Sequence, residues 1–227
     1  MKITMVVCTF NAMYCNMDML YSSLPEVNDT YDDVSVVSDI CIRPKGRLQD
    51  KGEIHTLVAA GVQPKNIGSL TCSMKYKSTN ISVFIFATGS VKLAMGIPDD
   101  INNSLTHAET SDVDNILDQH LLKIIKAICK LFDISYMNNS FKKHIVNGQI
   151  NLRFEDNSIE HLIKYMKTKK PRFMKLMEPD FNGKGRRYTI KAYLSTKRNI
   201  ALSRFGTGQT WGNKSATEVF QCFNKIL

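Results

Sequence analysis

The hydrophobic positions of this chain predict the same order of elements twice. Residues 141–227 predict a strand, a helix, three further strands and a final helix. Residues 1–133 predict the same order, interrupted by a polar insertion over about residues 25–66. Such repetition indicates two related repeats, 1–140 and 141–227, each pairing its strands into a sheet that is backed by helices.

Alternating residues predict a strand over residues 3–13, and a weaker alternation predicts one over residues 69–77. Residues 81–87 and 91–96 also predict strands, separated by a turn at residues 88–90. Apolar residues at helical spacing predict the longest helix over residues 112–132. Residues 98–112 are polar and are expected to form a loop. The insertion is acidic over residues 26–39 and turn-rich over residues 42–53, so it is expected to be a loop rather than core.

The second repeat is more compact, with strands predicted over residues 144–154, 173–177, 187–194 and 199–203. A helix is predicted over residues 158–167. The glycine-containing segment 205–213 is expected to link the last strand to a final helix that starts at Ser215. Ser215 and Glu218 have the spacing of a capping box.

The charge of the chain lies mostly in the second repeat. The whole chain has a formal net charge of +9, but residues 1–140 carry a net charge of −3 and residues 141–227 a net charge of +12. A segment this basic is typical of a protein that binds a polyanion, and nucleic acid is the obvious class.

Enzyme and cofactor chemistry finds little support in the sequence. The cysteines show no CxxC spacing and the histidines no HExxH or HxH pattern, so neither a metal nor any other cofactor is expected. The segment 205–212 lacks the GK[ST] ending of a phosphate-binding loop. No apolar run is long enough to span a membrane. We therefore expect a binding protein, not an enzyme, with no membrane and no small-molecule substrate among its partners.

One segment of the first repeat carries a family resemblance. Residues 83–89 read VFIFATG and residues 90–96 read SVKLAMG, which resembles the signature of the TATA-binding protein family, and Met74-Lys75-Tyr76 precede it at the family's distance. The order of elements extends the resemblance over most of the chain. The insertion and the divergent second repeat are similar to the TATA-binding-like proteins of large nucleocytoplasmic DNA viruses.

The resemblance implies an α+β fold: a TBP-like saddle in which two pseudo-symmetric repeats form one curved antiparallel sheet, with helices on the convex face. It further implies a transcription initiation factor that binds AT-rich promoter DNA in the minor groove and bends it. Its expected protein partner is a transcription factor IIB-like protein or RNA polymerase. The expected location is intracellular, in the host cytoplasm (viral factory) or virion for a viral protein and in the nucleus otherwise.

The resemblance also assigns residues to the DNA. Phe86 falls at a wedge position, whereas its expected partner in the first repeat falls at Ser69, which cannot wedge. Phe173 and Tyr193 fall at the wedge positions of the second repeat. Other groove-facing positions are Leu93, Met95, Ala201 and Ser203, and the strand 144–154 adds Asn147 and Gln149 as donors to adenine N3 or thymine O2.

Basic residues around the proposed groove are expected to contact phosphates, which positions a protein without specifying sequence. They are Lys170, Arg172, Lys184, Arg186, Arg187, Lys197 and Arg198. Two alternatives stay open. Phe84 and Phe86 share a face by parity, so either could belong to the core. The chain could also be a TBP-fold interaction module that docks transcription or virion proteins without binding DNA specifically, as the missing wedge at Ser69 and the acidic insertion favour.

Overall fold

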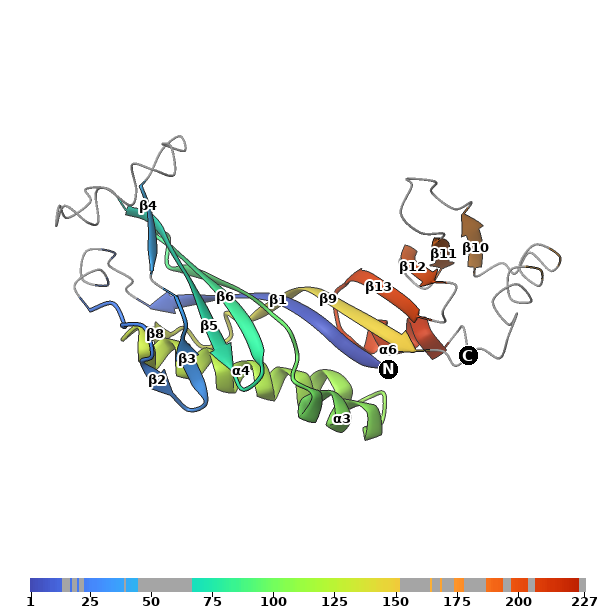
Figure 1. Ribbon diagram of the computed structural model, residues 1–227, viewed down its shortest axis with the longest axis horizontal. Helices are drawn as coiled ribbons and strands as arrows, with labels where there is room; N and C mark the ends of the chain where they lie inside the picture. The colour runs from blue at the N-terminus through green and yellow to red at the C-terminus, as the bar shows by residue number, and fades with distance from the viewer. Residues whose placement is uncertain are drawn as a thin grey trace. The chain divides into compact units, whose positions relative to one another are not determined.

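The structure is a computed structural model that describes residues 1–13, 17, 20, 23–38, 40–44, 67–151, 164, 168, 174–177, 187–193, 197–203 and 207–224 (Figure 1). It divides into two compact units, which are described separately. Unit 1 contains Met1–Val6, Asp99–Leu117 and His144–Leu227, and unit 2 contains Val7–Pro98 and Asp118–Lys143. Strand β1 (Lys2–Met13) and helix α4 (Val113–Leu131) each begin in unit 1 and continue into unit 2.

Unit 2 is built on an antiparallel sheet in which the strand order is β1-β7-β6-β5. Its hairpins join β5 (Ile67–Tyr76) to β6 (Thr79–Phe86) and β6 to β7 (Ser90–Met95). Gly89, at φ +80°, makes the second turn, a conformation that glycine adopts without strain. The predicted strands of this region and the long helix α4 are therefore confirmed.

The polar insertion contributes strands to the outer edge of this sheet, so the expectation that all of it is a loop is wrong. Strands β3 (Val34–Val36) and β4 (Cys41–Pro44) pair with different parts of β5, and β2 (Thr30–Tyr31) pairs with β3. The reason is local alternation: Val34 and Val36 are 0% and 1% exposed, while Ser35 between them is half-buried. At the other side, β8 (Ser135–Tyr136) pairs with the end of β1.

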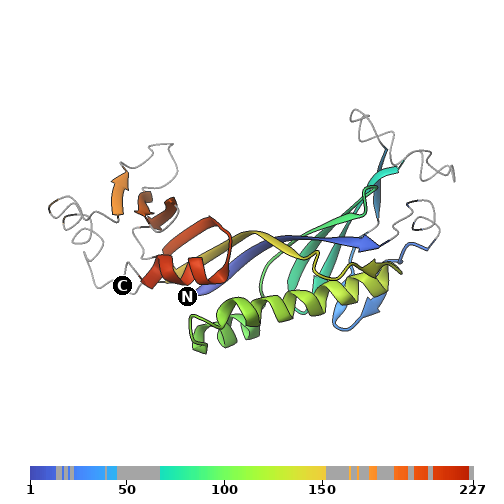
Figure 2. The ribbon, with the colours of Figure 1, turned by 180° about the vertical axis from the view of Figure 1, so that it is seen from behind.

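One face of the unit 2 sheet is buried. On β6 the odd-numbered residues Ile81, Val83 and Ile85 are at most 1% exposed, as are Leu121, Ile124, Ile125 and Ile128 of α4. Figure 2 shows α4 running along one side of these strands. Because side chains alternate across a strand, the even-numbered residues of β6 lie on the opposite face.

Unit 1 has an antiparallel sheet in the order β10-β11-β12-β13-β9, with β1 next to β9. The strands are β9 (Lys142–Asn151), β10 (Met174–Met177), β11 (Arg187–Tyr193), β12 (Lys197–Ser203) and β13 (Thr207–Asn213). Strand β13 lies where a glycine-containing link was expected, so that expectation is wrong. Its Thr210 and Asn213 side chains are buried and hydrogen-bonded to each other, which gives the segment a core face despite its glycines.

Two helices of unit 1 complete its core. Helix α6 (Ala216–Asn224) buries Val219, Phe220 and Phe223. Glu218 N–H donates to Ser215 Oγ at 3.1 Å, as in the predicted capping box, whereas Glu218 Oε2 accepts the N–H of Lys214 at 2.8 Å and not that of Ser215. Helix α3 (Asp99–His107) contradicts the loop expected over residues 98–112. It forms because two residues one turn apart, Ile101 and Leu105, are buried on one side.

The two units share one strand order. In unit 2 the first strand is followed by β7, β6 and β5, and in unit 1 β9 is followed by β13, β12 and β11. Each strand of one series therefore has a topological counterpart in the other. No helix among the described residues is long and apolar enough to cross a membrane.

Candidate nucleic-acid interface

The face of unit 2 opposite α4 carries polar, aromatic and basic side chains together. We call it the open face of unit 2, and it includes Arg43, Ser69, Thr71, Ser73, Asn80, Ser82, Phe84, Phe86, Ser90, Lys92 and Ala94. All of these side chains are half-buried or exposed, in contrast to their neighbours along each strand. This face is open to a ligand, whereas the other is filled by the core.

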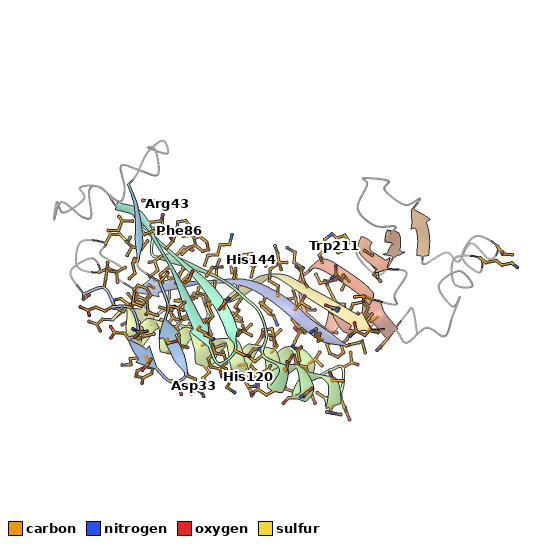
Figure 3. The ribbon with its side chains drawn as sticks, in the orientation of Figure 1. Asp33, Arg43, Phe86, His120, His144 and Trp211 are labelled. Atoms are coloured by element: carbon orange, nitrogen blue, oxygen red, sulfur yellow. The ribbon has the colours of Figure 1, made fainter. Side chains whose placement is uncertain are left out.

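A basic and an aromatic residue stand at one end of this face. Arg43 of β4 is the cross-strand partner of Ser69 of β5, and Ser69 is in turn the partner of Phe86 of β6. Phe86 is 37% exposed, which is high for a phenylalanine, and Arg43 is exposed (Figure 3). Phe86 therefore lies on an accessible face opposite the small Ser69, and its assignment as a wedge stays a prediction.

The second aromatic residue on this face is Phe84, which is half-buried. It is flanked by Lys92, whose Nζ lies 6.0 Å from the centroid of the Phe84 ring. The contact is at the outer limit for a cation–π interaction. Phe84 and Phe86 thus both lie outside the core, each with a cation on the same face.

Leu93 and Met95 do not face the proposed groove. They are 0% and 2% exposed and lie on the buried face with Val91, so their assignment as DNA contacts is wrong. The physical reason is the register of the β6–β7 hairpin, which pairs Val83 with Leu93 and Ile81 with Met95. Since Phe86 has the parity of Ser82 and Ala94, the residues of β7 on the open face are Ser90, Lys92 and Ala94.

Unit 1 has an open face of a different character. We define the open face of unit 1 as Asn147, Gln149, Asn151, Ala201, Thr207, Gln209 and Trp211. Gln149 pairs with Gln209, and Gln209 with Ala201, across three neighbouring strands. Ala201 is only 8% exposed between its larger neighbours. This face is dominated by amides, with one exposed aromatic ring.

The amides of this face are oriented by hydrogen bonds. Gly212 N–H donates to Asn147 Oδ1 at 3.0 Å, and Gln149 Nε2 donates to Asn151 Oδ1 at 3.2 Å. Because the carbonyl ends of Asn147 and Asn151 accept these bonds, their NH₂ ends are the groups that can serve a ligand. The face therefore offers donors, which match acceptors such as adenine N3 and thymine O2.

In the second repeat, strand order gives other counterparts of Ser69 and Phe86 than the sequence predicted. By strand order, β12 is the counterpart of β6 and β11 of β5, and the pair Arg187–Ser203 takes the place of the pair Ser69–Phe86. Tyr193 instead pairs with Lys197 beside the β11–β12 connection, so it does not occupy a position that corresponds to Ser69 or Phe86, and its assignment as a DNA contact stays a prediction. Ser203 occupies the position of Phe86, and neither member of the unit 1 pair is aromatic.

The remaining predicted contacts are only partly located. Arg187 lies on β11, and Lys197 and Arg198 lie on β12. Phe173, Lys170, Arg172, Lys184 and Arg186 are outside the described residues. Within the part of the chain that is described, no three His, Cys, Asp or Glu residues come together as a metal site would require.

Several residues of the open faces were not identified from the sequence. Arg43 lay in the presumed loop, and Gln209 and Trp211 lay in the presumed link. The signals in the sequence were the apolar Ile42 between Cys41 and Arg43, and the alternation of Gln209 and Trp211 with Thr210.

Comparison with solved structures identifies the fold. The chain matches the structure of TBP from Methanococcus jannaschii with a TM-score of 0.50, over 100% of this chain and 95% of that chain, at 14% sequence identity. A scan against protein-family models finds no match, and a search of curated proteins by sequence also finds none. The similarity at this identity concerns the fold alone. The chain therefore has a TBP-like fold, as the resemblance over residues 74–96 implied.

Proposed function

We propose that this chain is a TBP-like transcription initiation factor that binds AT-rich duplex DNA in the minor groove and bends it. The observation that carries the proposal is the open face of unit 2 on a TBP-like fold, where Phe86 is 37% exposed next to Ser69 and Arg43. An apolar ring on an accessible sheet face can enter a base step and unstack it. Arg43 and Lys92 supply the positive charge that such a contact needs beside phosphates or in a narrow groove.

The open face of unit 1 supplies the preference for AT-rich sequence in this proposal. The NH₂ groups of Asn147 and Asn151 would donate to minor-groove acceptors, while the guanine N2 amino group would oppose them as a second donor. The large positive charge of residues 141–227 would provide most of the electrostatic attraction. The two-repeat saddle inferred from the sequence is part of the proposal, and the strand order that both units share supports the repeat.

The proposal is tested with fluorescently labelled AT-rich and GC-rich duplexes of equal length, titrated across a salt series. We expect tighter binding to the AT-rich duplex, an affinity that falls as salt rises, and a shorter end-to-end distance by energy transfer in the complex. Phe86→Ala should weaken binding and reduce the bend. Tyr31→Ala is the matched control, because Tyr31 is 47% exposed on β2 and pairs with the buried Val34, on the side away from Phe86. Equal affinity for both duplexes, or no effect of Phe86→Ala, would contradict the proposal.

A second candidate function is an interaction module that keeps the fold without binding DNA specifically. It is favoured by the wedge pairs, since Ser69 stands beside Phe86 and the counterpart pair is Arg187 and Ser203. The proposed protein partner of the promoter factor is a transcription factor IIB-like protein or RNA polymerase, and that of the interaction module is a transcription or virion protein. The same titration separates the functions, because an interaction module would show no AT preference and no bend.

A further inference from the structure

We propose that Trp211 is the nucleobase-stacking residue of unit 1, in place of the aromatic wedges that its β11–β12 pair lacks. This inference rests on the proposed function. It places a DNA contact on β13, where the sequence predicted none. The ligand class is a nucleobase or base step of AT-rich DNA that has been unstacked. The step is non-covalent: the indole ring covers the face of a base.

Trp211 is unusually exposed for a tryptophan. Its side chain is 43% exposed, on a strand whose neighbouring residue Thr210 is 1% exposed (Figure 3). Tryptophan is highly buried on average in folded proteins, and burial of such a large ring is strongly favourable. A ring left accessible on the same face as Asn147 and Gln209 is therefore available to a flat apolar partner.

A β-bulge sets the position of this ring. Thr210 pairs with Gly148 and Asn213 with Val146, so Trp211 and Gly212 together lie opposite the single residue Asn147. Gly212 has φ +73°, a left-handed conformation that a residue with a side chain adopts only under strain. Bulges of this kind redirect side chains and are frequent beside functional sites.

The bulge is held in place by a side chain of the open face itself. Asn147 Oδ1 accepts the Gly212 N–H at 3.0 Å, and on the other side of the strand Asn213 Nδ2 donates to Val146 O at 3.0 Å. These bonds tie both residues that follow Trp211 to strand β9. A ring on a fixed backbone loses little conformational freedom when it stacks, which favours binding.

The exposed aromatic residue lies on different strands in the two units. Trp211 pairs with Asn199 on β12, and its counterpart in unit 2, Ala94, pairs with Ser82 on β6. In unit 2 the large ring is Phe86 on β6 and the residue on β7 is small. In unit 1 the position equivalent to Phe86 is Ser203, and the exposed ring among the described side chains is Trp211 on β13. Each open face thus carries an exposed aromatic residue, on different strands.

The single tryptophan of the chain makes the test direct, because intrinsic tryptophan fluorescence then reports Trp211 alone. The protein is titrated with an AT-rich duplex, with single-stranded oligo(dT), and with heparin as a polyanion without bases. Stacking should quench the fluorescence with both DNAs and not with heparin. In parallel, anisotropy of labelled duplex measures the affinity of wild type, Trp211→Phe, Trp211→Ala and the control Tyr31→Ala.

Base–aromatic stacking predicts that Trp211→Ala weakens DNA binding about 5- to 150-fold, with Trp211→Phe in between and Tyr31→Ala unchanged. Duplex binding with an AT preference, but without quenching and with Trp211→Ala at wild-type affinity, overturns the inference and leaves the proposed function standing. Absence of binding to every DNA probe by anisotropy overturns both. Circular dichroism of Trp211→Ala and Trp211→Phe must match that of wild type, so that a loss of binding is not a loss of fold.

Discussion

Ser69 and Phe86 are direct cross-strand partners on β5 and β6, and both lie on the open face of unit 2. Directly opposed side chains in an antiparallel sheet have Cβ atoms about 4.5–5.5 Å apart. A second ring at position 69 would therefore stand beside Phe86. Ser69→Phe is expected to increase both the affinity for AT-rich duplex and its bend, measured by anisotropy and energy transfer.

The matched control for this change is Ser73→Phe, on the same strand and face but opposite Ser82. A ring there has no aromatic neighbour across the strand and should leave the bend unchanged. If Ser69→Phe and Ser73→Phe change DNA binding equally, general hydrophobicity and not the pairing with Phe86 is responsible.

Gly148 is required by the packing of α6 on β9. A Cβ atom at this position would collide with Val219 Cγ1 and would lie 3.2 Å from Phe223 Cε2. Because both side chains are fully buried, they have little room to move. Gly148→Ala is expected to lower the free energy of unfolding by about 1–3 kcal/mol, measured by urea denaturation. An unchanged midpoint would show that α6 shifts freely.

Gly212 is required for its backbone conformation and not for space. No atom lies within 4 Å of a Cβ built there, but φ is +73°. Gly212→Ala should cost about 1–2 kcal/mol of stability, whereas Gly212→Asn should cost less because asparagine tolerates left-handed φ. Urea denaturation of both variants distinguishes strain from crowding, since crowding would make asparagine the worse substitution.

Asp114 joins α4 to the start of α6 within unit 1. Its Oδ1 accepts the Ala216 N–H at 2.9 Å and its Oδ2 the Thr217 N–H at 3.1 Å. Asp114→Ala leaves these helix-terminal donors without the carboxylate and should lower stability by about 1–2 kcal/mol. Asp114→Asn keeps one acceptor and should lie between Ala and wild type in thermal denaturation. The exposed Asn103→Ala on α3 is the control and should change stability by less than about 0.5 kcal/mol.

The thiols of unit 2 should differ in reactivity. Burial raises the pKa of Cys8, Cys72 and Cys129 to about 12, with Asp118 adding to the effect at Cys8, whereas Cys41 is exposed. Because the thiolate is the nucleophile, iodoacetamide at pH 8 should label Cys41 before Cys8, Cys72 and Cys129, as peptide mapping by mass spectrometry would show. Equal labelling of Cys8 and Cys41 in the folded protein would contradict the burial of Cys8.

The raised pKa values of these three thiols also determine how the stability of the protein changes at alkaline pH. An unfolded thiol loses its proton near pH 9, whereas these three folded thiols keep theirs to about pH 12. Between these values the folded state binds more protons than the unfolded state, so the contribution of the thiols to stability is complete below about pH 9 and is lost as the pH rises toward 12.

The sequence was sufficient where alternation was regular and the turn residues were unambiguous. Strand β6 is rich in β-branched and aromatic residues, and the Gly89 turn that follows it made both strands and their hairpin predictable. The residues of β7 that share a face with Phe86 are set by the register of the β6–β7 hairpin. An alignment that was wrong by one residue placed Leu93 on the open face, where the structure has Lys92. Helix α3 was not predicted because its composition is polar, with Ile101, Asn102 and Leu105 as its buried residues.

Long-range pairing explains the other differences. The valines of β3 are buried because β5 lies beside them, and the alternation of two valines about Ser35 is too short to predict a strand without that partner. The wedge positions of the second repeat depended on aligning β11 and β12 with β5 and β6, and only strand order shows that Ser203 replaces Phe86. Trp211 became a candidate only once its segment was seen to be a strand with a bulge.

The outer strands of unit 2 also affect how the folded protein behaves at high concentration. Strand β2 has two residues and β4 has four, and β2 turns into β3 through Asp32 and Asp33, both at positive φ. A second chain that approached β2 would find few backbone groups to pair with and would meet the carboxylates of Asp33 and of Asp32, the latter paired with Lys123 at 3.4 Å, which resists edge-to-edge aggregation. The insertion therefore gives a protein with a long β5 a boundary that other molecules of the same chain cannot readily extend.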